Sequence, residues 1–129
     1  MKNYLKRAVS VMVLAMAGSG SVAVADTDAM MEAAGKELFS KCSACHATDS
    51  SQNAFGPSLI GVVGRKAASL PRFAYSDALA QSGLTWNEGN LRKWIAGNDD
   101  FVPGTRMRHV AITDPAEQDY LIAYLKTLK

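Results

Sequence analysis

Two cysteines and a histidine in one short segment carry the strongest chemical signal in the sequence. Cys42, Cys45 and His46 form the pattern C-x-x-C-H, which is the attachment signature of a c-type haem. The spacing of the two thiols matches the separation of the two haem vinyl groups, and the adjacent histidine falls beneath the iron, where a neutral imidazole nitrogen is a good ligand. The motif therefore predicts one haem c, bound covalently through both thiols, with His46 as an axial iron ligand.

Three other kinds of site use the same residue types. A thioredoxin-like dithiol would follow a strand of a βαβ unit, and no such pattern precedes Cys42. A structural zinc site needs four ligands, and His109 is the one strong candidate outside the motif. A short disulfide gives His46 no function. Covalent haem is the interpretation that uses all three residues of the motif.

The first 25 residues have the composition of an export signal. Basic residues within the first seven positions precede an apolar run over residues 8–17, and a stretch of small residues ends at Ala25. This composition predicts a secretory signal peptide over residues 1–25, cleaved after Ala25. The alternative is an uncleaved membrane anchor, but the run is shorter than the about 20 apolar residues that cross a bilayer. We therefore expect a periplasmic protein with no membrane span after cleavage.

Removal of this segment changes the sign of the charge. The full sequence carries 14 basic and 12 acidic residues, and three basic residues leave with residues 1–25. Residues 26–129 thus carry 11 basic and 12 acidic side chains, so the composition gives no reason to expect binding to nucleic acid or to anionic membranes. The remaining 104 residues are enough for one small domain, whose marginal core a buried haem would enlarge.

Periodicity and turn residues predict an all-α domain. Helices are expected over residues 30–41, after a frayed start at 26–28, and over residues 77–81 and 88–96, the last closed by Gly97. Residues 47–72 contain repeated glycine and proline and predict a long ordered loop that wraps a cofactor. Residues 98–109 are also expected to be irregular, with Pro103-Gly104 as a turn.

The final helix has the clearest pattern. Asp114 is the expected N-cap, Pro115 the first helical residue, and Glu117 completes a pattern similar to a capping box. One apolar stripe follows, formed by Tyr120, Leu121, Tyr124, Leu125 and Leu128. Gly35 lies within the first predicted helix at a cost of about 1 kcal/mol relative to alanine, which favours a close backbone contact there with the last helix.

Further motifs follow one another along the chain and resemble those of class I c-type cytochromes, of the mitochondrial and bacterial c2 type. They are Gly35-Lys-Glu-Leu-Phe39, the C-x-x-C-H motif, Phe55-Gly56-Pro57, Gly64-Arg65-Lys66, Phe73-x-Tyr75-x-Asp77, Leu84-Thr85-Trp86, Pro103-Gly104-Thr105-Arg106-Met107 and Leu121-Ile122-Ala123-Tyr124-Leu125. The resemblance runs from about Gly35 to Leu128. It implies a single cytochrome c domain over residues 26–129, in which the first and last helices cross near Gly35 and Tyr124.

The resemblance also implies Met107 as the second axial ligand. After cleavage the methionines are Met30, Met31 and Met107, and the first two lie on the helix that enters the haem motif. Met107 lies in the Pro-Gly turn far downstream, where the chain can fold over the other haem face. A lone methionine is more often core filler, but its position in the turn and in the family favours a ligand.

Supporting residues are assigned by the same resemblance. Pro57 matches a proline whose carbonyl accepts the Nδ1–H of the proximal histidine. Tyr75 and Trp86 match residues that hydrogen-bond a buried haem propionate, and Arg65 matches the residue that offsets its charge. Thr105 matches a hydroxyl near the methionine sulfur. The alternative for these positions is ordinary aromatic packing and a surface arginine.

Several positions depart from the family pattern. His109 stands where many relatives have an aromatic residue over the haem edge. Trp94 replaces a pocket tyrosine and Leu79 a pocket asparagine, so the buried water network of the family is not carried over. Asp99 and Asp100 stand at positions that are often lysine in mitochondrial relatives, which weakens the basic docking ring.

The resemblance implies a one-electron carrier and no enzyme, because two axial side chains leave no place for a substrate on the iron. Its partners would be redox proteins, such as membrane cytochrome complexes, oxidases, a reaction centre or dehydrogenases. They would dock briefly onto a monomer, steered by Lys41, Arg106 and Arg108. Two alternatives stay open. One is an electron-accepting subunit of a periplasmic dehydrogenase complex; the other is a haem enzyme or gas binder with an open sixth site, for which His109 is the one distal acid–base candidate. Ligation by two histidines through His109 is a variant of the carrier.

Overall fold

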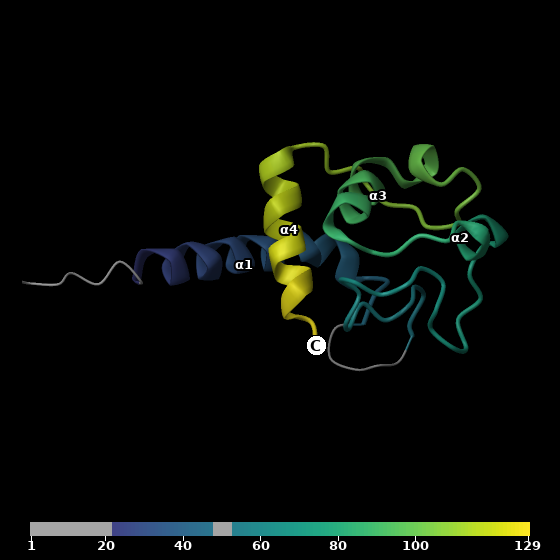
Figure 1. The fold of residues 1–129 in the computed structure, drawn as a ribbon, viewed down its shortest axis with the longest axis horizontal. Coiled ribbons are helices and arrows are strands. Elements are labelled where there is room, and N and C mark those ends of the chain that lie inside the picture. The colour runs from purple at the N-terminus through teal and green to yellow at the C-terminus, as the bar shows by residue number, and fades with distance from the viewer. Residues whose placement is uncertain (1–21, 48–52) are drawn as a thin grey trace, which may run out of the picture.

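This computed structural model describes residues 22–47 and 53–129. These residues form four α-helices joined by long irregular segments (Figure 1). They are α1 (Val22–Ser43), α2 (Asp77–Gln81), α3 (Glu88–Phe101) and α4 (Pro115–Thr127). Within these ranges no strand forms, and Lys66 and Thr85 make an isolated antiparallel bridge. The predicted all-α class is therefore confirmed.

The two terminal helices cross each other, and α1 makes far more contacts with α4 than α3 does (Figure 1). Gly35 lies at the crossing. A Cβ atom built on Gly35 would be 1.9 Å from the carbonyl oxygen of Tyr120 and 2.8 Å from Cβ of Tyr124, so a glycine is what lets the backbones approach this closely. The rings of Phe39 and Tyr124 pack beside it, with centroids 5.2 Å apart. The expected close contact of Gly35 with the last helix is confirmed.

Helix α4 begins as its sequence predicts. The side chain of Asp114 accepts hydrogen bonds from the backbone N–H groups of Ala116 and Glu117, at 2.8 and 3.0 Å, and Pro115 is the first helical residue. Its buried face is wider than the predicted stripe, since Ile122 is 2 % exposed and Gln118 is buried as well. The reason is that α4 packs against α1 and also contacts α3.

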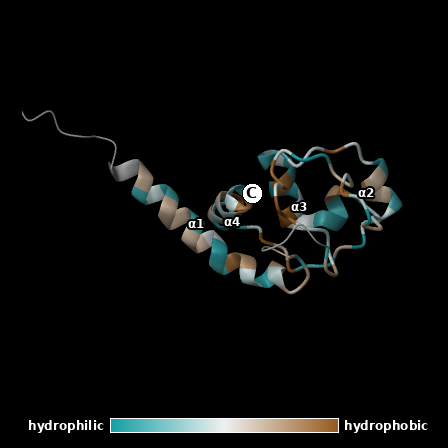
Figure 2. Ribbon diagram, turned by 90° about the horizontal axis from the view of Figure 1, so that it is seen from below, coloured by the Kyte–Doolittle hydropathy of each residue, from teal (hydrophilic) through white to brown (hydrophobic). Residues whose placement is uncertain are grey.

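Two helices differ from their predicted bounds. Helix α1 begins at Val22, so residues 26–28, expected to be frayed, are helical. No glycine or proline interrupts residues 22–34, and this run is rich in alanine and methionine, which favour helix. The first part of α1 projects beyond α4, the helix it packs against, and residues 25–30 are exposed (Figures 1 and 2). Helix α3 continues past Gly97 to Phe101, because Gly97 forms a kink (φ 176°, ψ 87°) and not an end.

The segments between helices form much of the core. Residues 53–72 are irregular, as expected, and Val62 and Ala67 from this loop are buried together with side chains of all four helices. The helical core residues include Phe39, Leu79, Leu91, Ile95, Leu121, Ile122 and Leu125. No helix of the described ranges has the length and apolar composition needed to cross a bilayer. The predicted signal peptide lies outside the described residues up to position 21.

Candidate cofactor site

A cavity of about 760 Å³ opens between the end of α1, the loop over residues 53–76, helix α3 and the segment 105–110. This volume falls in the range of about 300–1,000 Å³ that buries a large organic ligand. All the residues proposed from the sequence as site residues line it: Cys42, Cys45, His46, Pro57, Arg65, Tyr75, Trp86, Thr105 and Met107. Core side chains such as Phe39, Leu79 and Ile95 complete an apolar wall. Residues far apart in the sequence are thus gathered around one space.

A hydrogen bond to the backbone fixes the ring of His46 and leaves Nε2 available to bind a metal. The motif turns tightly at the end of α1, where the N–H groups of Cys45 and His46 both donate to the carbonyl of Cys42 at 3.0 Å. The Nδ1 atom of His46 lies 2.7 Å from the carbonyl oxygen of Pro57, so Nδ1 carries the proton and donates it. Nε2 then keeps its lone pair, which is what a metal ligand requires. The hydrogen bond expected for Pro57 is formed.

Burial and steric fit also favour a neutral, fixed imidazole. The side chain of His46 is buried, and desolvation lowers its pKa against the smaller opposing effect of the Pro57 hydrogen bond. Gly56 lies directly against the ring, since a Cβ built there would lie 2.4 Å from Cε1. Any other residue at position 56 would displace the imidazole. The sequence motif Phe55-Gly56-Pro57 therefore positions His46 on two sides.

The two cysteines are free thiols in different surroundings. Cys45 is exposed, whereas Cys42 is half-buried, and burial raises the pKa of the Cys42 thiol while Lys41 lowers it to a smaller extent. Among the described residues no group of three or more histidine, cysteine or acidic side chains is placed to hold a metal ion. The zinc alternative therefore gains no support from the geometry.

Met107 is held by two side chains of α3. The indole N–H of Trp94 donates to the thioether sulfur at 3.2 Å, and the amide of Asn98 donates to the backbone carbonyl of Met107 at 2.8 Å. Both donors are buried. Trp94 is one of the departures from the family pattern, and Asn98 is a site residue that was not predicted from the sequence. An asparagine one turn after a pocket tryptophan, on a helix with an apolar buried face, was the available signal.

Arg65, Tyr75 and Trp86 form the polar part of the cavity wall. Arg65 donates to the carbonyls of Ser58 and Ile60, both at 2.8 Å, and burial lowers the pKa of its guanidinium although the nearby Tyr75 raises it. The described residues form three ion pairs, and Arg65 takes part in none of them. A half-buried cation facing a cavity without a carboxylate partner suits an anionic group of a bound ligand.

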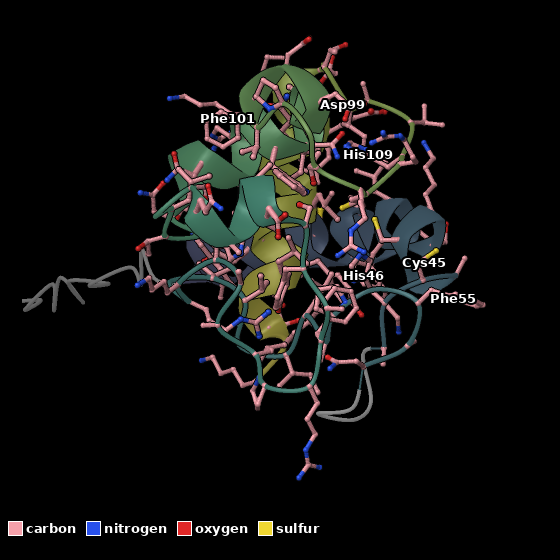
Figure 3. All side chains as sticks on the ribbon, turned by 90° about the vertical axis from the view of Figure 1, so that its right-hand side faces the viewer. Cys45, His46, Phe55, Asp99, Phe101 and His109 are labelled. Atoms are coloured by element: carbon pink, nitrogen blue, oxygen red, sulfur yellow. The ribbon has the colours of Figure 1, made fainter. Side chains whose placement is uncertain are left out.

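The surface around the opening combines apolar and basic side chains. Phe55 is 90 % exposed and Val110 is 79 % exposed, and both border the cavity together with Lys41, Arg106 and Arg108. Figure 3 looks onto this face, with Phe55 projecting outward beside Cys45. Arg108 forms an ion pair with Asp99 at 2.8 Å, which supports the expected weakening of positive charge here.

His109 also borders the cavity. Its Nδ1 lies 2.9 Å from the carbonyl of Val110, so Nδ1 donates and Nε2 keeps a lone pair. This Nε2 atom is buried and has no hydrogen-bond partner among the described residues. The residue is therefore a second imidazole at the site with an available nitrogen.

The chain is also similar to known proteins of one family. The sequence model of the cytochrome c family matches residues 32–129. Cytochrome c2 iso-2 of Magnetospirillum fulvum is 46 % identical over 90 residues, which are 70 % of this chain and 94 % of that protein. Cytochrome c2 of Rhodoblastus acidophilus is 43 % identical over 97 residues, 74 % of this chain and 91 % of that protein. The solved structure of cytochrome cH from Methylobacterium extorquens superposes with a TM-score of 0.70 at 47 % identity, covering 74 % of this chain and 97 % of that one.

Proposed function

The chain belongs to the cytochrome c family, and we propose that it is a periplasmic one-electron carrier whose haem iron is ligated by His46 and Met107. The family binds one covalent haem c and transports electrons, and Cys42 and Cys45 with His46 provide its attachment motif. The observation that carries the proposal is the convergence of the motif and Met107 on one cavity of suitable size, with Nε2 of His46 available.

The haem supplies, when bound, an iron that changes between Fe(II) and Fe(III) by one electron. The side chains fix its surroundings. His46 would ligate through Nε2 while Pro57 holds the ring, and Met107 would ligate through its sulfur. A thioether sulfur has two lone pairs, so the hydrogen bond from Trp94 leaves one pair for the iron. A methionine ligand favours the reduced state and raises the reduction potential.

A haem propionate is the anion that the polar wall of the cavity suits. Arg65 would offset its negative charge, because the guanidinium has five N–H donors and only two are used by the carbonyls of Ser58 and Ile60. Tyr75 and Trp86 would donate to it, and the hydroxyl of Thr105 would lie near the methionine sulfur. Burial raises the pKa of the Tyr75 phenol, which keeps its proton available for donation.

Electron exchange would take place through the exposed face of the cavity. Lys41, Arg106 and Arg108 give this face positive charge that steers an approaching redox protein, and the exposed Phe55 and Val110 supply a small apolar contact. Such a patch favours a brief encounter over a permanent complex. We further propose that residues 1–25 are a cleaved signal peptide and that residues 26–129 are the single mature domain.

A spectrum of the purified, haem-loaded protein tests the ligand assignment. The oxidised protein should show the weak red sulfur-to-iron charge-transfer band, and Met107→Ala should abolish it and lower the reduction potential. His109→Ala should keep the band. A wild-type protein that lacks the band and binds carbon monoxide when reduced would overturn the closed site and favour the open-site alternative. If the wild-type protein lacks the band and the His109→Ala variant loses the sixth iron ligand, the iron has two histidine ligands.

A further inference from the structure

Two donors from one helix converge on Met107. Trp94 and Asn98 lie four positions apart on α3, and they bind the two ends of the same residue, the sulfur at 3.2 Å and the backbone carbonyl at 2.8 Å. Trp94 is 7 % exposed and Asn98 is 5 % exposed. The kink at Gly97 lies between them, so this convergence depends on a local backbone conformation and is not simply the result of helical periodicity.

We propose that Asn98 is a positioning residue that, together with Trp94, clamps Met107 at two points and keeps the sixth position of the iron closed. This rests on the proposed ligation by Met107. The bond from Trp94 directs the sulfur, and the bond from Asn98 fixes the backbone from which the side chain extends. A side chain anchored at only one point has more conformations in which its sulfur is away from the iron.

Other anchors of the segment are weaker candidates for this function. The guanidinium of Arg108 also donates to the Met107 carbonyl, at 3.0 Å, but its side chain is 70 % exposed and competes with water. Thr105 is tied back to Val102 by a backbone hydrogen bond, which sets the turn and leaves the Met107 carbonyl untouched. Asn98 is therefore the buried anchor of this carbonyl, and its loss leaves an acceptor without its buried donor.

Imidazole is a suitable probe, because it can bind the iron only when Met107 has left. The apparent affinity for imidazole is proportional to the fraction of protein with an open sixth position. Asn98→Leu has a similar volume and no donor. Loss of one net hydrogen bond should raise the open fraction, and therefore the imidazole affinity of the oxidised haem protein, by about tenfold. Trp94→Phe should increase it by a similar factor, and the charge-transfer band should disappear at correspondingly lower imidazole concentrations in both variants.

Asn90→Leu is the matched control. Asn90 lies on the same helix, and its amide donates to the carbonyl of Thr85 at 2.8 Å, so the same chemical change is made away from Met107. It should bind imidazole as the wild type does. If Asn98→Leu does not take up haem, Asn98→Ser, which is smaller and cannot span the same distance, should give the same increase.

The clamp is overturned if the charge-transfer band is present in the wild type and the Asn98 and Trp94 variants bind imidazole within about twofold of Asn90→Leu. In that case both residues only support the fold, and the proposed electron carrier stands. Absence of the band in the wild-type protein overturns both proposals, because Met107 is then no ligand. Failure of both Asn98 variants to bind haem leaves Trp94→Phe to decide, by the same comparison with Asn90→Leu.

Discussion

Replacement of Gly35 by alanine should severely weaken the crossing of α1 and α4. The added Cβ would lie 1.9 Å from the carbonyl oxygen of Tyr120 and 2.6 Å from its carbonyl carbon. An ordinary contact needs at least 3.4 Å, so the helices must shift apart by about 1.5 Å at this point. Both nearest atoms belong to the backbone of α4, and no side-chain rotation can relieve the contact.

The cost follows from this geometry. Overpacking of a well-packed site costs about 1–3 kcal/mol, and a contact with rigid backbone belongs at the upper end. Alanine recovers about 1 kcal/mol of this cost through its better helix propensity, so the net cost is about 2 kcal/mol. We expect Gly35→Ala to lower the free energy of unfolding by about 2 kcal/mol, which corresponds to a loss of about 8–16 °C in melting temperature for a domain of this size.

Denaturant and thermal unfolding of the haem-loaded protein, followed by circular dichroism, measure this loss. Gly89→Ala is the matched control, because a Cβ on this helical glycine would have its nearest neighbour at 3.5 Å, an ordinary contact. Its stability should stay within about 1 kcal/mol of the wild type or rise. If Gly35→Ala is as stable as Gly89→Ala, the close approach of the two helices is wrong.

Three further changes test other parts of the structure. Burial raises the pKa of Tyr75, so the unfolded chain loses the phenol proton near its ordinary pKa of about 10 while the folded protein keeps it. The free energy of unfolding should therefore fall as pH rises above that value, and it should fall less steeply in Tyr75→Phe. Equal slopes for the two proteins in urea unfolding at several pH values would contradict this. Ala68 has φ of +55°, a left-handed backbone conformation that strains alanine and suits glycine. Ala68→Gly should therefore raise the free energy of unfolding by about 1 kcal/mol, whereas Ala67→Gly, at a buried site, should lower it. A loss of stability in both variants would refute the backbone strain at Ala68. Arg106→Gln should slow electron exchange with the anionic oxidant ferricyanide at low salt, with the difference vanishing at high salt; a salt-independent difference would argue against steering.

The helices whose ends carry local signals were predictable from the sequence. Helix α2 spans Asp77–Gln81 and α4 begins at Pro115, as predicted, since Ser76 and Asp114 cap their first turns. The start of α1 was not, because residues 22–29 contain no capping pattern that distinguishes helix from an exposed tail. The length of α3 was underestimated because glycine often ends a helix and here only bends it.

The residues of the candidate site were predictable because their types and order are characteristic, and all of them border the cavity. Their predicted functions remain predictions. Asn98 was missed because its position one turn after Trp94 is only a weak signal, and its contact with the Met107 carbonyl depends on the kink at Gly97 and on the path of the chain nine residues later. Similarly, the bonds of Arg65 to the carbonyls of Ser58 and Ile60 depend on loop geometry that no periodicity predicts.

The crossing of α1 and α4 also sets the order in which the molecule can form. The two helices come from opposite ends of the described chain, so α1 has no partner for its Gly35 and Phe39 surface until residues 115–127 have been synthesised and released. An incomplete chain on the ribosome therefore stays open, and closing so long a loop is a late and slow event. In the open chain the Cys42 thiol escapes the burial that raises its pKa, so more of it is thiolate, the reactive form. Covalent capture of a vinyl group is thus favoured before the two ends of the chain meet.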